Sequence, residues 1–200
     1  MASVMRPSRR LFAMVALLLA LAFVKPAAAT LVLALDLPTL VARADQISVV
    51  DVVSVKTSWN ADHNRILTTI DLAVVDCWKG AAAPASHVQV VQPGGSLDGL
   101  TMRVEGMPPF SPGERTLLFL RFPPQTPGRA IVVGMAQGKR PLRREEATGR
   151  WMVSAPGRAG AAFVRTTPAS AEVFKAQPRP LVDLRTEVRA LVTGAAGGGR

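Results

Sequence analysis

The sequence predicts a mainly β fold: a closed or partly open antiparallel barrel with a short helix before it and another helix after it. Three observations over the 200 residues support this. Short segments of alternating apolar and polar residues recur through the middle of the chain, turn-forming Pro and Gly separate them, and a helical pattern follows near the end. Short strands divided by turn signals are typical of barrels and sandwiches, so a sandwich is the alternative architecture.

Residues 1–29 have the pattern of a signal peptide. Three arginines precede an uncharged stretch over 11–24, and small residues follow it, so cleavage is expected after Ala29. The uncharged stretch of 14 residues is shorter than the ~20 apolar residues that a membrane-spanning helix needs. We therefore expect a protein that is exported to the periplasm or out of the cell and keeps no stable membrane span.

Charge and composition exclude several classes of protein. The leader holds four of the 24 basic residues and none of the 14 acidic ones, so its removal lowers the net charge from +10 to +6, an ordinary value for a soluble surface. With no Tyr and few other aromatics, the chain offers little for base stacking, and nucleic-acid binding is not expected. One Cys and two His exclude an intrachain disulfide, a cysteine-rich zinc site and a three-His metal site. No metal or cofactor is predicted.

Cys77 is the single cysteine of a chain expected in an oxidising compartment. A lone Cys there is expected to be buried and inert, or to form a disulfide with a second chain. The sequence leaves this choice open, together with the oligomeric state.

The elements are expected in a definite order. Residues 30–44 form an N-terminal segment with a short helix that begins at Asp36, which acts as its cap. The barrel then occupies 45–155, followed by an irregular linker over 156–180, a helix over 181–193 and a flexible tail over 194–200. Within the barrel, strands are expected near 47–56, 66–79, 88–90, 100–104, 117–120, 131–133 and 151–153.

Alternation assigns the inward faces of these strands. The inward face of the first strand is expected to hold Ile47, Val49, Val53 and Val55. A bulge near Val50–Asp51 would turn the Asp51 carboxylate outward. The second strand is expected to end in a buried Trp78, and the continuous apolar run Leu117–Leu120 is typical of a strand covered on both faces.

Three short motifs occur in order along the predicted barrel. They are Ala44-Asp45-x-Ile47, Val74-x-x-Cys77-Trp78-Lys79-Gly80, and Phe110-x-x-Gly113-Glu114 followed by Leu117–Leu120. In this order they resemble the netrin-like modules and the tissue inhibitors of metalloproteinases. They resemble more closely a group of exported bacterial proteins with the same framework, which share a P-G-G (here 93–95) and a Q-G-K (here 137–139). The resemblance covers about 44–140 and implies an OB-type barrel.

The resemblance does not carry over the inhibitory function. The metalloproteinase inhibitors begin with a Cys whose amine and carbonyl chelate the zinc of the target. Here the expected mature N-terminus is Thr30, with no Cys near it. The resemblance therefore implies the framework of the inhibitors without their zinc-binding wedge.

No motif of a known catalytic site is present. Gly134–Arg140 has three residues between its glycines where a phosphate-binding loop has four, and it lacks the hydroxyl that binds Mg²⁺. His63 lies in a polar turn and His87 at the start of a strand, each either solvated or part of a site. A triad would also need an oriented nucleophile, which the sequence does not identify.

Candidate contact residues lie in two places. The densest basic segment contains Lys139, Arg140, Arg143 and Arg144, and it either contacts an anionic polymer or forms a solvated hairpin. Phe110, in a Pro-rich loop, either points outward as a contact residue or closes the end of the barrel.

These features predict an exported, non-enzymatic β-barrel module that binds a protein or an anionic polymer of the cell envelope. One alternative is an exported hydrolase with a site near His63 or His87. Another is a structural accessory of a surface assembly.

Overall fold

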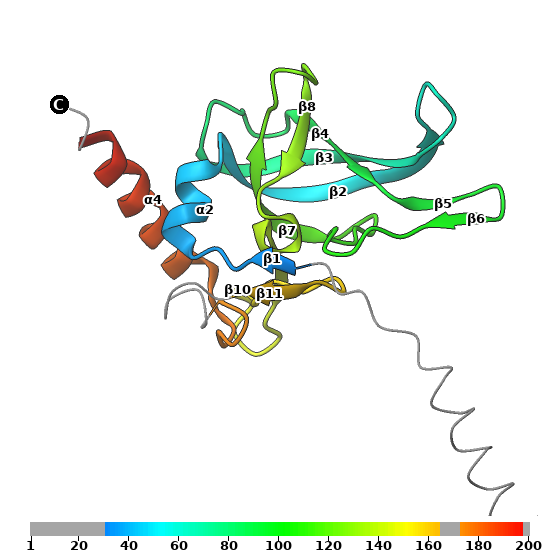
Figure 1. The fold of residues 1–200 in the computed structure, drawn as a ribbon. Coiled ribbons are helices and arrows are strands. Elements are labelled where there is room, and N and C mark those ends of the chain that lie inside the picture. The colour runs from blue at the N-terminus through cyan, green and yellow to red at the C-terminus, as the bar shows by residue number, and fades with distance from the viewer. Residues whose placement is uncertain (1–30, 165–172, 198–200) are drawn as a thin grey trace, which may run out of the picture.

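A computed structural model describes residues 31–164 and 173–197, with side chains described as far as 194. Within these residues the fold is mainly β, with one helix near the N-terminus and one at the C-terminal end, as the sequence predicts (Figure 1). The strands are β1 Leu31–Leu33, β2 Gln46–Trp59, β3 Ile66–Lys79, β4 His87–Pro93, β5 Gly95–Leu97, β6 Leu100–Met102, β7 Arg115–Arg121, β8 Arg129–Val132, β9 Lys139–Arg144, β10 Trp151–Val153, β11 Ala162–Val164 and β12 Arg179–Pro180. The helices are α2 Leu37–Arg43 and α4 Leu181–Gly197, and a 3-10 turn, η1, spans Met135–Gly138.

The main sheet has the strand order β12-β10-β9-β7-β2-β3-β4-β8, and β7 also pairs with β8. The strands β2, β3, β4, β8 and β7 thus form a closed series of pairings, which two short contacts complete. One is the parallel β4–β8 ladder at Gln89 and Val90, and the other is the β7–β8 ladder at Leu120 and Arg121. Because β9, β10 and β12 continue outward from β7, the sheet as a whole is not a clean barrel.

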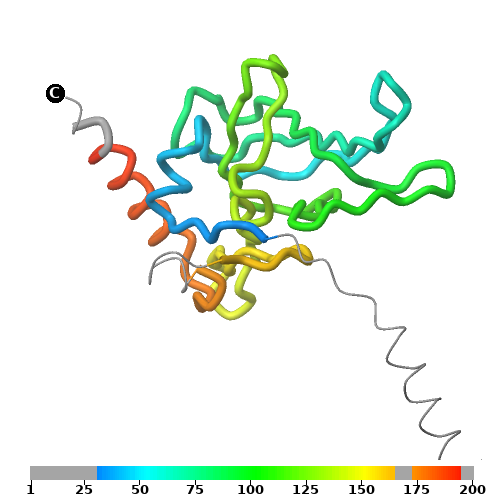
Figure 2. The backbone as a smooth tube through the Cα atoms, viewed as in Figure 1, coloured from blue at the N-terminus to red at the C-terminus, as the bar shows by residue number. Residues whose placement is uncertain are grey.

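Two smaller sheets lie beside the main one. β5 and β6 form a hairpin, and β1 pairs in parallel with β11. The hairpin shows that the strand expected over 100–104 ends at Met102. The hairpin projects away from the main sheet, and Leu100 is exposed because β6 pairs only with β5 (Figures 1 and 2).

The inward face expected for β2 is wrong at Val53, which is 49% exposed, while Val50 and Val52 are buried. The β2–β3 ladder has register shifts at Ile47/Ser48, Val49/Val50 and Val52/Ser54. The first two shifts have their extra residue on β3, so alternation along β2 holds from Ile47 to Val52. The third has its extra residue, Val53, on β2 itself, which leaves Val53 without a partner on β3 and puts Val55 on the face of Val52. The bulge expected in this strand near Val50–Asp51 is wrong, because β2 pairs with β7 without interruption from Gln46 to Asp51 and the nearby shift has its extra residue, Val75, on β3.

The buried side chains form two clusters, one on each side of β2 and β7. Leu117 and Phe119 of β7 join the cluster under the helices, which also contains Trp78. Leu118 and Leu120 join the cluster enclosed by β2, β3, β4 and β8. The prediction that Leu117–Leu120 is covered on both faces is therefore confirmed, and so is the burial of Trp78 at the end of β3.

Helices α2 and α4 cover the same side of the sheet and contact each other (Figure 1). The predicted cap is confirmed, because Asp36 Oδ1 accepts a hydrogen bond of 3.0 Å from the Thr39 N–H. α4 buries Leu184 and Val188 against the sheet. It begins where expected but continues to Gly197, through part of the expected tail.

The chain directly after the expected cleavage site belongs to the fold. Gln137, in the Q-G-K motif, is fully buried. Its Oε1 accepts a hydrogen bond from the Leu35 N–H at 2.6 Å, and its Nε2 donates to the Leu33 carbonyl at 2.9 Å. The expected leader, residues 1–29, lies outside the described residues. In the part of the chain that is described, no helix combines the length and the apolar character needed to cross a bilayer.

Candidate functional site

The basic segment predicted as a contact region is strand β9, and it does not act as one surface. Arg143 and Arg144 are exposed, as a solvated hairpin would have them. Lys139 and Arg140 are instead only 6% and 8% exposed. Because neighbouring residues of a strand point to opposite faces, Lys139 and Arg140 are buried in different surroundings.

Lys139 is fully engaged by its neighbours. Its Nζ lies 2.7 Å from Glu114 Oε1, donates to the Pro109 carbonyl and sits 4.4 Å above the centroid of the Phe110 ring. Burial lowers the pKa of Lys139, while Glu114 opposes this shift. Phe110 is partly buried against the cluster inside the sheet. Lys139 and Phe110 thus hold the Pro-rich loop against the sheet.

Arg140 has no such partner. Among the residues that the structure describes, none forms a hydrogen bond or an ion pair with its guanidinium. Burial, and secondarily the nearby positive charge of Arg179, lower the pKa of Arg140 to about 10, so it remains protonated at neutral pH. A buried charge without a partner lowers the stability of a fold.

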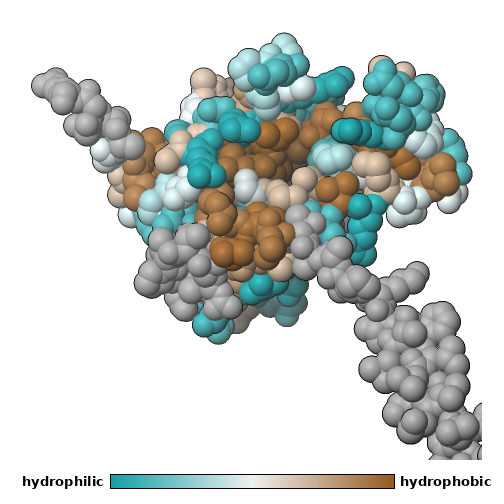
Figure 3. Space-filling model, viewed as in Figure 1, coloured by the Kyte–Doolittle hydropathy of each residue, from teal (hydrophilic) through white to brown (hydrophobic). Residues whose placement is uncertain are grey.

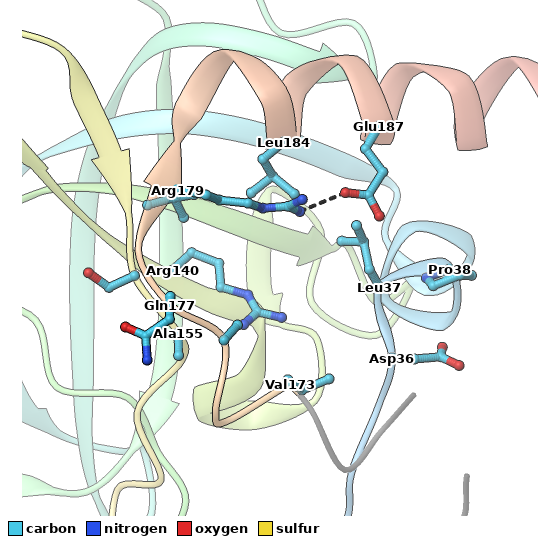
Figure 4. Close-up of a pocket in the computed structure, with 13 residues that line it drawn as sticks. Asp36, Leu37, Pro38, Arg140, Ala155, Val173, Gln177, Arg179, Leu184 and Glu187 are labelled. Carbon is cyan, nitrogen blue, oxygen red and sulfur yellow. Dashed lines mark ion pairs between the residues drawn. The ribbon is translucent and has the colours of Figure 1, made fainter. Parts of the chain in front are cut away.

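The side chain of Arg140 reaches into a pocket of about 360 Å³ between the sheet and the two helices (Figure 4). Most of the pocket wall is apolar. The lining residues are Asp36, Leu37, Pro38, Arg140, Val153, Ser154, Ala155, Val173, Ala176, Gln177, Arg179, Leu184 and Glu187.

Strand pairing fixes the position of Arg140 in this wall. Arg140 pairs with Leu117 of β7, and its carbonyl accepts a hydrogen bond of 2.9 Å from Thr116 Oγ1, which is buried. The face of Arg140 is the face of Leu117 and Leu142, both members of the cluster under the helices. The guanidinium is therefore directed toward α2 and α4.

The opposite wall is held by contacts distant in sequence. β10 pairs with β12 through Val153 and Arg179, which brings Arg179 beside the pocket. Phe174 contacts Phe163 of β11 with ring centroids 4.5 Å apart, and the guanidinium of Arg158 lies 4.7 Å from the centroid of the Phe174 ring. These contacts anchor the segment that supplies Val173 and its neighbours to the wall.

The other charged groups of the pocket are already engaged. Arg179 forms an ion pair of 2.7 Å with Glu187 of α4 (Figure 4). The Asp36 carboxylate caps α2, and its hydrogen bonds with Thr39 lower the pKa of Asp36. Of the four charges that line the pocket, that of Arg140 is therefore the one left uncompensated by another described residue. This arrangement can receive an anionic group.

A larger pocket of about 600 Å³ lies at the start of α4, beside Trp78 and Trp151. Two of its four charged residues pair with each other, because Asp76 accepts a hydrogen bond from Arg185 at 3.2 Å as well as one from Trp78 Nε1 at 2.8 Å. Arg185 Nε is buried without a hydrogen-bond partner among the described residues, but the Arg185 guanidinium as a whole is paired with Asp76 and is 39% exposed.

Exposed apolar side chains gather over β1 and β11 (Figure 3). They are Leu31, Leu33 and Val164. They carry no charged or polar group that would specify a partner.

The two histidines stay apart from the pocket. His63 lies in the β2–β3 turn and stacks on Trp59 with centroids 6.2 Å apart. His87 pairs with Ala73 of β3, and its Nδ1 lies 3.1 Å from Asp71 Oδ1 at an exposed position. Over the described ranges, no three His, Cys, Asp or Glu side chains come together as a metal site would require. Cys77 is half-buried, and its thiol donates to the Lys79 carbonyl.

No family model, curated protein or solved structure matches the chain. The resemblance to the netrin-like modules and the metalloproteinase inhibitors therefore rests on the sequence motifs alone.

Proposed function

We propose that this protein is an exported, non-enzymatic OB-like barrel module that binds another macromolecule through an anionic group received by Arg140. The observation that carries the proposal is a protonated guanidinium that is 8% exposed, opens into a pocket and has no partner among the described residues. The partner is a protein or an anionic polymer of the envelope, since either presents such groups.

The strand pairing supports the OB-like part of the proposal. An OB fold is a five-stranded, partly open barrel. The closed series β2-β3-β4-β8-β7 has five strands, and two of its contacts are only two residue pairs long. β9, β10 and β12 extend this unit and build the pocket on its outer side.

The leader pattern and the position of β1 support export. The Gln137 hydrogen bonds hold the backbone of Leu33 and Leu35, directly after the expected cleavage at Ala29. Cleavage there would leave every one of these contacts in the mature protein.

Removal of Arg140 tests the proposed function. Mature protein, Arg140→Met and Arg143→Met are used as baits in an envelope extract, and the captured molecules are quantified by mass spectrometry. Arg143 is the matched control, because it lies on the same strand and is exposed. A specific partner should be captured by the mature protein and by Arg143→Met and lost from Arg140→Met. Equal capture by all three would contradict the proposal.

The alternative of an exported hydrolase is favoured by one observation, the contact between His87 and Asp71. A carboxylate that orients a His is part of many hydrolytic sites. The pair is exposed, however, and neither His hydrogen-bonds with a Ser, Thr or Cys side chain among the described residues. Ester and peptide hydrolysis that disappears in His87→Ala would establish this alternative.

A further inference from the structure

We propose that the Arg140 pocket receives a singly charged carboxylate on an apolar body, such as the C-terminal residue of a polypeptide or a short aliphatic acid. This rests on the proposed function and names the chemical class of the bound group. Four features of the pocket lead to it: its free charge, the shape of its cation, its apolar wall and its size.

The charges of the pocket favour one negative charge. Two carboxylates, Asp36 and Glu187, and two arginines line the pocket. Glu187 is already paired with Arg179 at 2.7 Å. Asp36 is engaged as the cap of α2. A ligand with one negative charge pairs with Arg140, whereas a second charge would face the carboxylates of Asp36 and Glu187 without a free cation.

The cation favours a planar acid. A guanidinium presents its N–H groups as a flat fork, which matches the two oxygens of a carboxylate in a bidentate pair. Figure 4 shows the fork of Arg140 extending into the space between Leu37, Val173 and Leu184.

The wall favours an apolar body behind the carboxylate. Side chains that can contact an aliphatic group line the pocket from four parts of the chain; they are Leu37, Val153, Val173, Ala176 and Leu184. The volume of about 360 Å³ lies at the lower end of the range for ligand pockets. The pocket therefore suits a small acid or one end of a chain better than a continuous stretch of a polymer.

Three ligands with the same six-carbon chain separate charge from hydrophobicity. Hexanoate, hexyl phosphate and hexanol are titrated into mature protein at pH 7 by calorimetry, with the melting temperature as a second readout. Hexanoate should bind at least tenfold more tightly than either of the others and should raise the melting temperature. Equal affinity for hexyl phosphate would overturn the proposed class.

The variants locate the bound group. Hexanoate affinity should fall at least tenfold in Arg140→Met, should fall less in Arg140→Lys, which keeps the charge without the fork, and should be unchanged in Arg143→Met. Circular dichroism of each variant checks the fold. Hexanoate binding that survives in Arg140→Met would overturn the site.

A second comparison identifies the source of the carboxylate. A tetrapeptide that ends in a free Leu is compared with the same peptide as its amide. Preference for the free acid identifies a polypeptide C-terminus as the ligand, and binding of hexanoate alone identifies a free aliphatic acid.

An acid of the chain itself is tested separately. Glu172 is the acidic residue of 165–172, which lies outside the described residues. Hexanoate affinity should be the same in Glu172→Gln. A tenfold increase there would mean that the chain supplies the anion itself, and would overturn an external ligand.

The two proposals fail in different ways. If the captured partner depends on Arg140 but no carboxylate probe binds, the site stands and the ligand class is wrong. If hexanoate binds at Arg140 but partner capture is the same without Arg140, the ligand class stands and the proposed function is wrong.

Discussion

At the scale of single residues, Lys139 and Arg140 show how strand alternation gives two adjacent cations opposite surroundings. Lys139 faces Glu114, the Pro109 carbonyl and the Phe110 ring. Arg140 faces an apolar pocket with a second arginine beside it. The first is a structural contact, and the second is a buried charge without a partner among the described residues, which lowers the stability of the fold.

Replacement of Arg140 by Met should therefore stabilise the unliganded protein. A buried charge exchanged for an apolar side chain of similar size removes the cost of desolvation, so the free energy of unfolding should rise by about 1–3 kcal/mol. Urea denaturation at pH 7 measures this. Arg143→Met should stay within about 0.5 kcal/mol of the parent, since Arg143 is exposed. A loss of stability in Arg140→Met would show that Arg140 is paired in the native state.

The difference in unfolding free energy between Arg140→Met and the parent should depend on pH. Burial lowers the pKa of Arg140 from its usual value to about 10 in the fold, so above pH 10 the folded state releases this proton before the unfolded state does. The unfolded state then binds more protons, and the unfolding free energy of the parent rises with pH relative to Arg140→Met. The advantage of Arg140→Met should be constant from pH 6 to 9 and shrink toward pH 11. A constant advantage across this range would contradict the lowered pKa.

At the scale of elements, the sequence predicts what local pattern determines. The Asp36 cap and the run Leu117–Leu120 depend on neighbours within a few positions, and both are confirmed. The face of Val53 does not depend on its neighbours in sequence, because it is set by a bulge that arises in the pairing with the partner strand. The basic segment 139–144 is predicted as a contact region or a solvated hairpin, and its burial at Lys139 and Arg140 comes from pairing with β7, which lies distant in the sequence.

The candidate site was predictable only in part. The sequence singles out Arg140 by its basic neighbours, and Leu142 two positions later is a sign that the face is buried. Arg179, Leu184 and Glu187 were not expected as site residues. Their place beside Arg140 arises from the β10–β12 pairing and the packing of α4, which no local pattern encodes.

The packing of β3 gives a prediction at this scale. Trp78 is 6% exposed in the cluster under the helices, and its Nε1 donates to Asp76. Trp78→Ala should lower the free energy of unfolding by about 3–5 kcal/mol, as is typical of a deleted core aromatic. Thermal and urea unfolding measure this, with Leu100→Ala as the exposed control. A loss below about 1 kcal/mol would contradict the burial of Trp78.

At the scale of the whole molecule, a five-stranded series of pairings forms one core, and the helices with β9, β10 and β12 form a second layer around the pocket. The pocket lies within the second layer, because its lining residues come from β9, β10, β12, the two helices and residues 154–155 and 173–177. A change in how α4 packs would alter the wall that faces Arg140.

Export is a prediction about the whole chain. Expressed in a bacterium with an intact secretion pathway, the protein should be recovered with Thr30 at its N-terminus, as N-terminal sequencing would show. Leu18→Arg, which places a charge in the uncharged stretch, should keep the uncleaved chain inside the cell. Recovery of the parent chain from the membrane fraction with Met1 intact would contradict cleavage.

The placement of β1 has a consequence for the order of folding. Leu31–Leu33 pair with Ala162–Val164, and the Leu35 N–H reaches Gln137 across 102 positions. A chain that emerges N-terminus first, from the ribosome or through a translocation pore, exposes β1 long before its partners arrive. Contacts of such long range form slowly. The first strand to emerge is therefore among the last to be fixed, and a chain cut before residue 162 would leave it without a partner.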